Sequence, residues 1–228
     1  MNSSKSNEIE QLSQAKELAE SVRASLINEV YAGSLTLNSK LPFKAISLRE
    51  LLHHRLSDLV DVSIQLCEAN LLVSAFVMAR AVVETTAMLF WLHKKTVEFN
   101  KTKDVGVFDQ FLMKGMFGSK DAEGPVLPHN ILSAVDHLEK KSNGFRHMYD
   151  ILCEFTHPNY AGVLGTYGWI DESKHMVYLG KHHQELPAFF AVGPLTICME
   201  LFKEYYNKLS EEFKVCNDYF EQHPTTED

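Results

Sequence analysis

Apolar side chains recur at every third or fourth position over most of this chain, which is the spacing of one buried face of an α-helix. The longest apolar stretch runs from Leu71 to Leu92 and reads LLVSAFVMARAVVETTAMLFWL. A helix that is apolar on nearly every side is covered by its neighbours. We therefore expect this stretch, extended to Lys95, to be the central helix of the protein.

Six other segments have helical periodicity. Ser47 begins the second of them, because Glu50 three residues later completes the spacing of a capping box. We predict helices over residues 8–31, from Ser47 onward, over 107–117, 129–141 and 143–155, and a last long helix that Gly193-Pro194 interrupts before it runs to Phe220.

The periodicity changes to two between Gly162 and Leu179, where VLGTYGWI and HMVYL flank the polar run Asp171–Lys174. This alternation is typical of a β-hairpin, which we expect to lie across the helices. The fold class predicted from the sequence is mainly all-α, an antiparallel helical bundle with one small β-hairpin near residues 162–179.

The length of 228 residues, with 45% hydrophobic residues, fits one domain over residues 1–228 with disordered tails at 1–7 and 222–228. The four cysteines are scattered without a disulfide framework, which favours reduced thiols. The N-terminus has no apolar signal core. Arg80 and Glu84 near the centre of the apolar stretch oppose membrane insertion. We expect a cytoplasmic protein with no membrane contact.

The formal net charge is -8 at pH 7, and no long run carries one sign. Nucleic acid is not expected as a partner, because neutralising phosphates supplies most of the affinity of a nucleic-acid-binding protein. Lys94, Lys95, Lys101 and Lys103 gather after the central helix. That arrangement is more typical of a solvated helix end than of a local basic binding spot.

Arg80 and Glu84 are the polar pair of the central helix. Residues four apart share a helix face, so the two side chains can touch. A guanidinium has five donors, more than one carboxylate satisfies, which requires a further partner. His157 is the candidate, because Pro158 ends a helix there and the helix dipole favours a charged imidazole. The cluster is either structural or a binding site.

The sequence contains little that indicates a metal site or a catalytic nucleophile. Glu50-x-x-His53 has the spacing used in di-iron bundles, but a second helical copy is missing, so we expect no metal and no cofactor. The pair His182-His183 stands alone. The chain contains no GxSxG, Walker loop or HExxH. Cys153 lies four residues before His157, yet a buried, inert thiol explains it better.

Two segments, AFVMARAVVETTAMLFWL and YDILCEFTHPNYAG, resemble those of uncharacterised bacterial helical proteins that have an R-x-x-x-E core helix and a later L-x-x-x-x-H-P segment. These proteins are distantly similar to the HEPN superfamily of helical, often dimeric proteins, many of them ribonucleases. The resemblance covers residues 47–162. It implies a homo-oligomer in which Arg80, Glu84 and His157 line one pocket.

The leading hypothesis is a binding protein for a small anionic ligand, a nucleotide or a segment of a partner. Arg80 would anchor the anion, Glu84 would orient Arg80, and His157 would be a titratable contact. Trp91 and Tyr160 would form apolar walls. Catalysis is not expected, because the R-x(4–6)-H motif of catalytic HEPN proteins has no counterpart before His157.

Two alternatives stay open. One is a metal-independent ribonuclease of toxin or phage-defence type, acting through Arg49 and His54 or through Arg80 and His157 across a dimer. The other is a self-associating scaffold whose polar core sets only the helix register.

Overall fold

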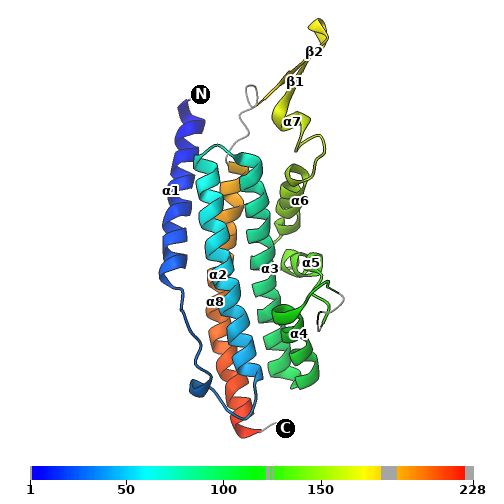
Figure 1. Ribbon diagram of the computed structural model, residues 1–228. Coiled ribbons are helices and arrows are strands. Elements are labelled where there is room, and N and C mark those ends of the chain that lie inside the picture. The colour runs from blue at the N-terminus through cyan, green and yellow to red at the C-terminus, as the bar shows by residue number, and fades with distance from the viewer. Residues whose placement is uncertain (1, 122–123, 125, 181–188, 224–228) are drawn as a thin grey trace.

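A computed structural model describes residues 2–121, 124, 126–180 and 189–223. Over these residues the chain forms α-helices and one two-stranded antiparallel sheet, which confirms the predicted fold class (Figure 1). The elements are α1 (Asn2–Ala24), α2 (Leu41–Glu68), α3 (Leu72–Thr102), α4 (Val105–Phe117), α5 (Ile131–Glu139), α6 (Phe145–Thr156), α7 (Leu164–Tyr167), β1 (Gly168–Asp171), β2 (Met176–Leu179) and α8 (Phe189–Gln222), with short 3-10 helices at Ala32–Ser34 and Glu172–Lys174.

Helix α3 is the centre of the molecule, as its apolar sequence predicts. It packs against α2 and α8 on one side and against α4, α5 and α6 on the other (Figure 1). Its side chains Phe76, Val82, Leu89 and Leu92 are fully buried. Among the described helices, α3 is long and apolar enough to cross a membrane, but 56% of its apolar window is buried inside the fold. That burial is typical of a core helix.

Helix α1 completes the layer of long helices by packing against α2 and α8. It begins at Asn2 and ends at Ala24, whereas the sequence predicted a disordered start and a helix over 8–31. The described chain ends at His223, one residue after α8, so most of the predicted C-terminal tail lies outside the described residues.

Helix α2 begins six residues earlier than the sequence predicted. Pro42 lies in its first turn, where the missing N–H of a proline costs no helical hydrogen bond. The hydroxyl of Ser39 accepts a hydrogen bond from the backbone N–H of Leu41 at 3.2 Å. Ser47 is therefore inside the helix and caps nothing, and Glu50 is free to point into the bundle.

Strands β1 and β2 form the hairpin that the sequence predicted, with Trp169 paired to Tyr178. The helix α7 replaces the first half of the predicted strand. The hairpin stands beyond one end of the long helices and does not lie across them (Figure 1). Trp169 and Tyr178 stack on each other with ring centroids 4.9 Å apart, so they stabilise the hairpin locally.

Helix α8 is continuous from Phe189, although the sequence predicted a break at Gly193-Pro194. Pro194 lies in the first two turns of α8, where the helix tolerates the loss of one backbone hydrogen bond. The His182-His183 pair lies outside the described residues.

Candidate functional site

Arg80 and Glu84 meet as predicted, and their further partner is Tyr149 of α6. Arg80 Nε lies 3.3 Å from Glu84 Oε1. The Tyr149 hydroxyl accepts hydrogen bonds from Arg80 Nε at 3.3 Å and Nη2 at 3.1 Å. The same hydroxyl donates to Glu84 Oε1 at 3.0 Å, and Arg80 Nη1 reaches Thr156 Oγ1 at 3.5 Å. The guanidinium is thus held by α6.

This pair is not in the core, contrary to the sequence-based expectation. The side chains of Arg80 and Glu84 keep 32% and 23% of their exposure, because long charged side chains on a buried helix extend to its edge. Burial works against the charge of Arg80, but the hydrogen bonds that Arg80 donates to Tyr149 and the attraction of nearby groups such as Glu84 together outweigh burial and raise the pKa of Arg80. Burial also raises the pKa of Tyr149 to about 12, so Tyr149 remains a donor near neutral pH.

The other residues predicted for this pocket lie apart from it. His157 is the exposed residue after α6, and its backbone N–H donates to Cys153 at 3.1 Å. Tyr160 is 73% exposed. Trp91 is eleven residues beyond Arg80 on α3, about 16 Å along the helix axis, and packs against His129 and other rings. The residues that were predicted to line one pocket therefore do not lie together.

A second polar cluster is buried between α2 and α8, where the sequence analysis did not expect one. Arg49 Nε donates to Glu50 Oε1 at 2.6 Å, and Arg49 Nη1 donates to Ser210 at 2.8 Å. The Tyr206 hydroxyl lies 3.0 Å from both carboxylate oxygens of Glu50. Arg49 also stacks 4.2 Å above the Tyr206 ring. The side chains of Arg49 and Glu50 are only 11% and 6% exposed.

This cluster holds a charge in the core. Burial alone favours a neutral Glu50 carboxyl, but His53, Arg49 and Tyr206 together lower the pKa of Glu50 below its usual value. Arg49 is therefore committed to an internal ion pair. His54 faces elsewhere, with Nε2 2.8 Å from the Ile27 carbonyl oxygen. Arg49 and His54, one of the two residue pairs of the ribonuclease alternative, thus bind separate partners.

An open basic pocket of about 470 Å³ lies between α3, α8 and the end of α5. Its polar lining is cationic or neutral and contains no carboxylate, in a chain whose net charge is -8. The lining residues are Phe90, His93, Lys94, Val97, His137, Lys140, Lys141, Tyr205 and Lys208. Cavities of this volume are typical of small-molecule sites. This is the chemically most distinctive cavity of the described residues.

The floor of the basic pocket is aromatic. Phe90 and Tyr205 meet edge to face with centroids 4.8 Å apart, and the His93 ring lies 5.3 Å from Tyr205. Lys208 Nζ lies 5.0 Å from the centre of the Tyr205 ring and pairs with Glu204 at the rim. The pocket therefore combines an apolar base with a cationic rim.

The two imidazoles of the pocket are disfavoured as cations. Burial lowers the pKa of His93. The carboxylates of Glu212 and Glu204 raise this pKa, whereas the ammonium of Lys208 lowers it, and the net shift is downward. Burial and the neighbouring lysines Lys94 and Lys140 lower the pKa of His137. Both rings are thus mainly neutral near pH 7, and each can supply one N–H donor.

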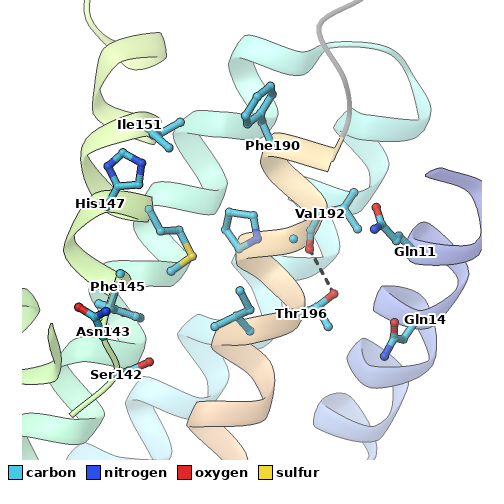
Figure 2. A pocket seen from close by; sticks show the side chains of 15 residues that line it. Gln11, Gln14, Ser142, Asn143, Phe145, His147, Ile151, Phe190, Val192 and Thr196 are labelled. Atoms are coloured by element: carbon cyan, nitrogen blue, oxygen red, sulfur yellow. Dashed lines mark hydrogen bonds between the residues drawn. The ribbon is translucent and has the colours of Figure 1, made fainter. Parts of the chain in front are cut away.

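A second cavity, of about 450 Å³, lies between α1, α6 and α8 and is mostly apolar. Figure 2 shows Gln11 and Gln14 on the α1 side and His147 and Ile151 on the α6 side. Thr196 donates its hydroxyl hydrogen to the Val192 carbonyl at 3.2 Å and so is occupied within α8. The cavity brings no set of titratable groups together, so it indicates no reaction.

Among the described residues, no group of three or more His, Cys, Asp and Glu side chains is placed to hold a metal ion. Glu50 and His53 are neighbours in the buried cluster, where Arg49 occupies the carboxylate. A second Glu-x-x-His spacing, Glu172 to His175, belongs to the exposed hairpin connection and not to a helix of the bundle. These spacings therefore do not assemble into a di-iron site.

Comparisons of this chain with protein-family models, curated proteins and solved structures give no match. The functional argument therefore rests on the geometry of the basic pocket.

Proposed function

We propose that this protein is a cytoplasmic helical bundle that binds a small anion in the basic pocket and does not act as an enzyme. The observation that supports this proposal is the convergence of four lysines and two histidines on one cavity without an acidic lining residue. The site differs from the one expected at Arg80, whose donors are directed to Glu84, Tyr149 and Thr156.

Electrostatics favours an anion at this position. Ammonium groups that line the same cavity repel one another, and the screening length at physiological salt is about 8 Å. A bound anion removes this repulsion. A cationic cavity on an acidic protein also concentrates small anions locally and orients their approach.

The cytoplasmic location in this proposal is supported by the thiols. Cys67, Cys198 and Cys216 are buried and free, and Cys153 is half-buried and free. Buried free thiols are typical of proteins from a reducing compartment.

The test is a thermal-unfolding series with phosphate, pyrophosphate, sulfate and citrate at constant ionic strength. A ligand present at 100 times its Kd adds about 2.7 kcal/mol to the stability of the folded state. For a chain of this size that raises Tm by roughly 5–10 °C. At least one of the four anions is expected to produce such a shift.

Two double variants with equal charge change locate the effect. Lys94→Gln with Lys140→Gln removes two pocket lysines, whereas Lys101→Gln with Lys203→Gln removes two exposed lysines outside the pocket. The first variant is expected to lose the anion-dependent shift and the second to keep it. Equal shifts in both variants, or no shift with any anion in the unmodified protein, would refute the proposal.

A further inference from the structure

The basic pocket has more positive charge than a monoanion can neutralise. Lys208 pairs with Glu204, but Lys94, Lys140 and Lys141 form no ion pair within the described residues. Three uncompensated ammonium groups therefore border one cavity. A single carboxylate or sulfonate would leave most of that charge unmatched, whereas a group with two negative charges would match it much better.

The type of cation in the pocket also discriminates between head groups. The lining contains no arginine, although the planar guanidinium is the group that best fits a carboxylate with two parallel hydrogen bonds. A lysine ammonium is a compact point charge with three donors that rotate freely. Several such groups around one centre suit the oxygens of a tetrahedral phosphoryl group.

His137 adds a directed donor to this arrangement. Its Nδ1 lies 3.2 Å from Lys94 Nζ. Because an ammonium only donates hydrogen bonds, Nδ1 is the acceptor, and the ring hydrogen is therefore on Nε2. The neutral ring can thus donate from Nε2 while Lys94 is held against its other side.

The size and floor of the pocket indicate that the phosphoryl group has an organic body attached. The volume of about 470 Å³ is in the range of cavities that enclose small organic ligands. Phe90, Val97 and Tyr205 line the cavity with apolar surface. An inorganic anion would leave that surface in contact with water.

Resting on the proposed function, we propose that the ligand is a dianionic phosphate ester with a small apolar body. Its phosphoryl group binds among Lys94, Lys140 and Lys141. Its body lies against Phe90 and Tyr205.

Isothermal titration calorimetry at pH 7.5 and constant ionic strength tests this ligand class with three probes. Phenyl phosphate has the ring and two charges, since its second pKa is about 6. Benzenesulfonate has the same ring and a tetrahedral head with one charge. Inorganic phosphate has the head without the ring. Phenyl phosphate is expected to bind at least tenfold more tightly than either of the other probes.

Variants assign the binding to the pocket. Lys140→Gln with Lys141→Gln is expected to weaken phenyl phosphate at least tenfold, whereas Lys101→Gln with Lys203→Gln leaves its Kd within twofold. Circular dichroism and Tm of each variant check that the fold is intact. Lys94→Gln changes a lysine of α3, whereas Lys140 and Lys141 follow the end of α5, and this variant repeats the test should the first variant fold poorly.

The outcomes separate this inference from the proposed function. If phenyl phosphate and benzenesulfonate bind with equal affinity and the pocket variant binds neither, the proposed anion site stands, but the proposal that the ligand is a dianion is wrong. If inorganic phosphate binds as tightly as phenyl phosphate, the proposal that the ligand has an apolar organic body is wrong. No binding of any probe, together with no Tm shift in the anion series, would overturn both proposals.

Discussion

Lys94 Nζ lies 3.2 Å from His137 Nδ1 across the seam between α3 and α5. The contact joins a permanent cation to an imidazole whose pKa is lowered, first by burial and then by this lysine. The pair is stable only while the imidazole is neutral, because protonation would remove the acceptor and place two cations side by side. The stability of this seam is therefore expected to depend on pH.

The first prediction concerns stability in mild acid. Burial lowers the pKa values of His93, His129 and His137 in the folded protein. As pH falls, the unfolded chain takes up these protons first, near its histidine pKa of about 6.5. The free energy of unfolding is thus expected to decrease from pH 7.5 to 5.5 in urea titrations.

A variant pair assigns this pH dependence. His93→Asn with His137→Asn removes two of the three groups and is expected to reduce the loss of stability between the two pH values. His147→Asn changes an exposed histidine and is expected to leave that loss as in the unmodified protein. Parallel pH profiles for the two variants would contradict the role given to the half-buried imidazoles.

The second prediction concerns the buried ion pair. Glu50→Gln leaves the Arg49 guanidinium without its carboxylate at a site where both side chains are almost fully covered. Breaking a buried pair from one side costs about 3–5 kcal/mol. Urea unfolding is expected to show a loss of that size. Glu98→Gln, which breaks a more exposed pair with Lys95, is the control and is expected to cost less than about 1 kcal/mol.

The third prediction concerns the hydroxyl between Arg80 and Glu84. Tyr149→Phe removes the group that accepts from Arg80 and donates to Glu84. The pair is partly hydrated, so the expected loss is about 1–2 kcal/mol. Tyr160→Phe removes the hydroxyl of an exposed tyrosine and should change the free energy of unfolding by less than about 0.5 kcal/mol. Equal effects of the two substitutions would mean that Tyr149 does not hold the pair.

The fourth prediction concerns thiol reactivity. Cys67, Cys198 and Cys216 are buried, and burial raises their pKa values to about 11, 12 and 12. The reactive species is the thiolate, so these three are expected to react slowly in the folded protein. Iodoacetamide at pH 8 followed by peptide mass spectrometry should label Cys153 first.

Cys153→Ser is the matched variant for this experiment. It is expected to abolish the fast phase of labelling and leave the slow phase in place. A fast phase that persists in this variant would show that one of the buried cysteines is accessible.

Much of the fold could be predicted because each helix has its own apolar stripe. The central helix, the run of short helices after it and the hairpin all follow from periodicity. The ends of the helices did not follow from periodicity, since Pro42 lies in the first turn of α2 and Pro194 lies within the first two turns of α8. Periodicity also misjudged burial: Arg80 extends to the edge of the bundle, while Glu50 and His53 are covered by α8.

The candidate site could not be predicted for a different reason. Lys94 and Lys140 are 46 positions apart, and they meet only because α5 returns beside α3. The lysines after the central helix look like an ordinary solvated helix end in the sequence. The clearest signal available was the pair Lys140-Lys141 at the end of a predicted short helix, but a sequence without known contacts does not place this pair next to Lys94.

The nine-residue length of α5 has a consequence for how the basic pocket works. A helix that short does not persist on its own in water, and α5 is held mainly by its packing against α3 and α6. A ligand whose phosphoryl group binds Lys94 and Lys140 and whose body lies against Tyr205 would link the end of the short helix to the two longest ones. Binding of the ligand is then expected to stabilise α5 as well. Slower amide hydrogen exchange over Ile131–Glu139 in the presence of the ligand would show this stabilisation.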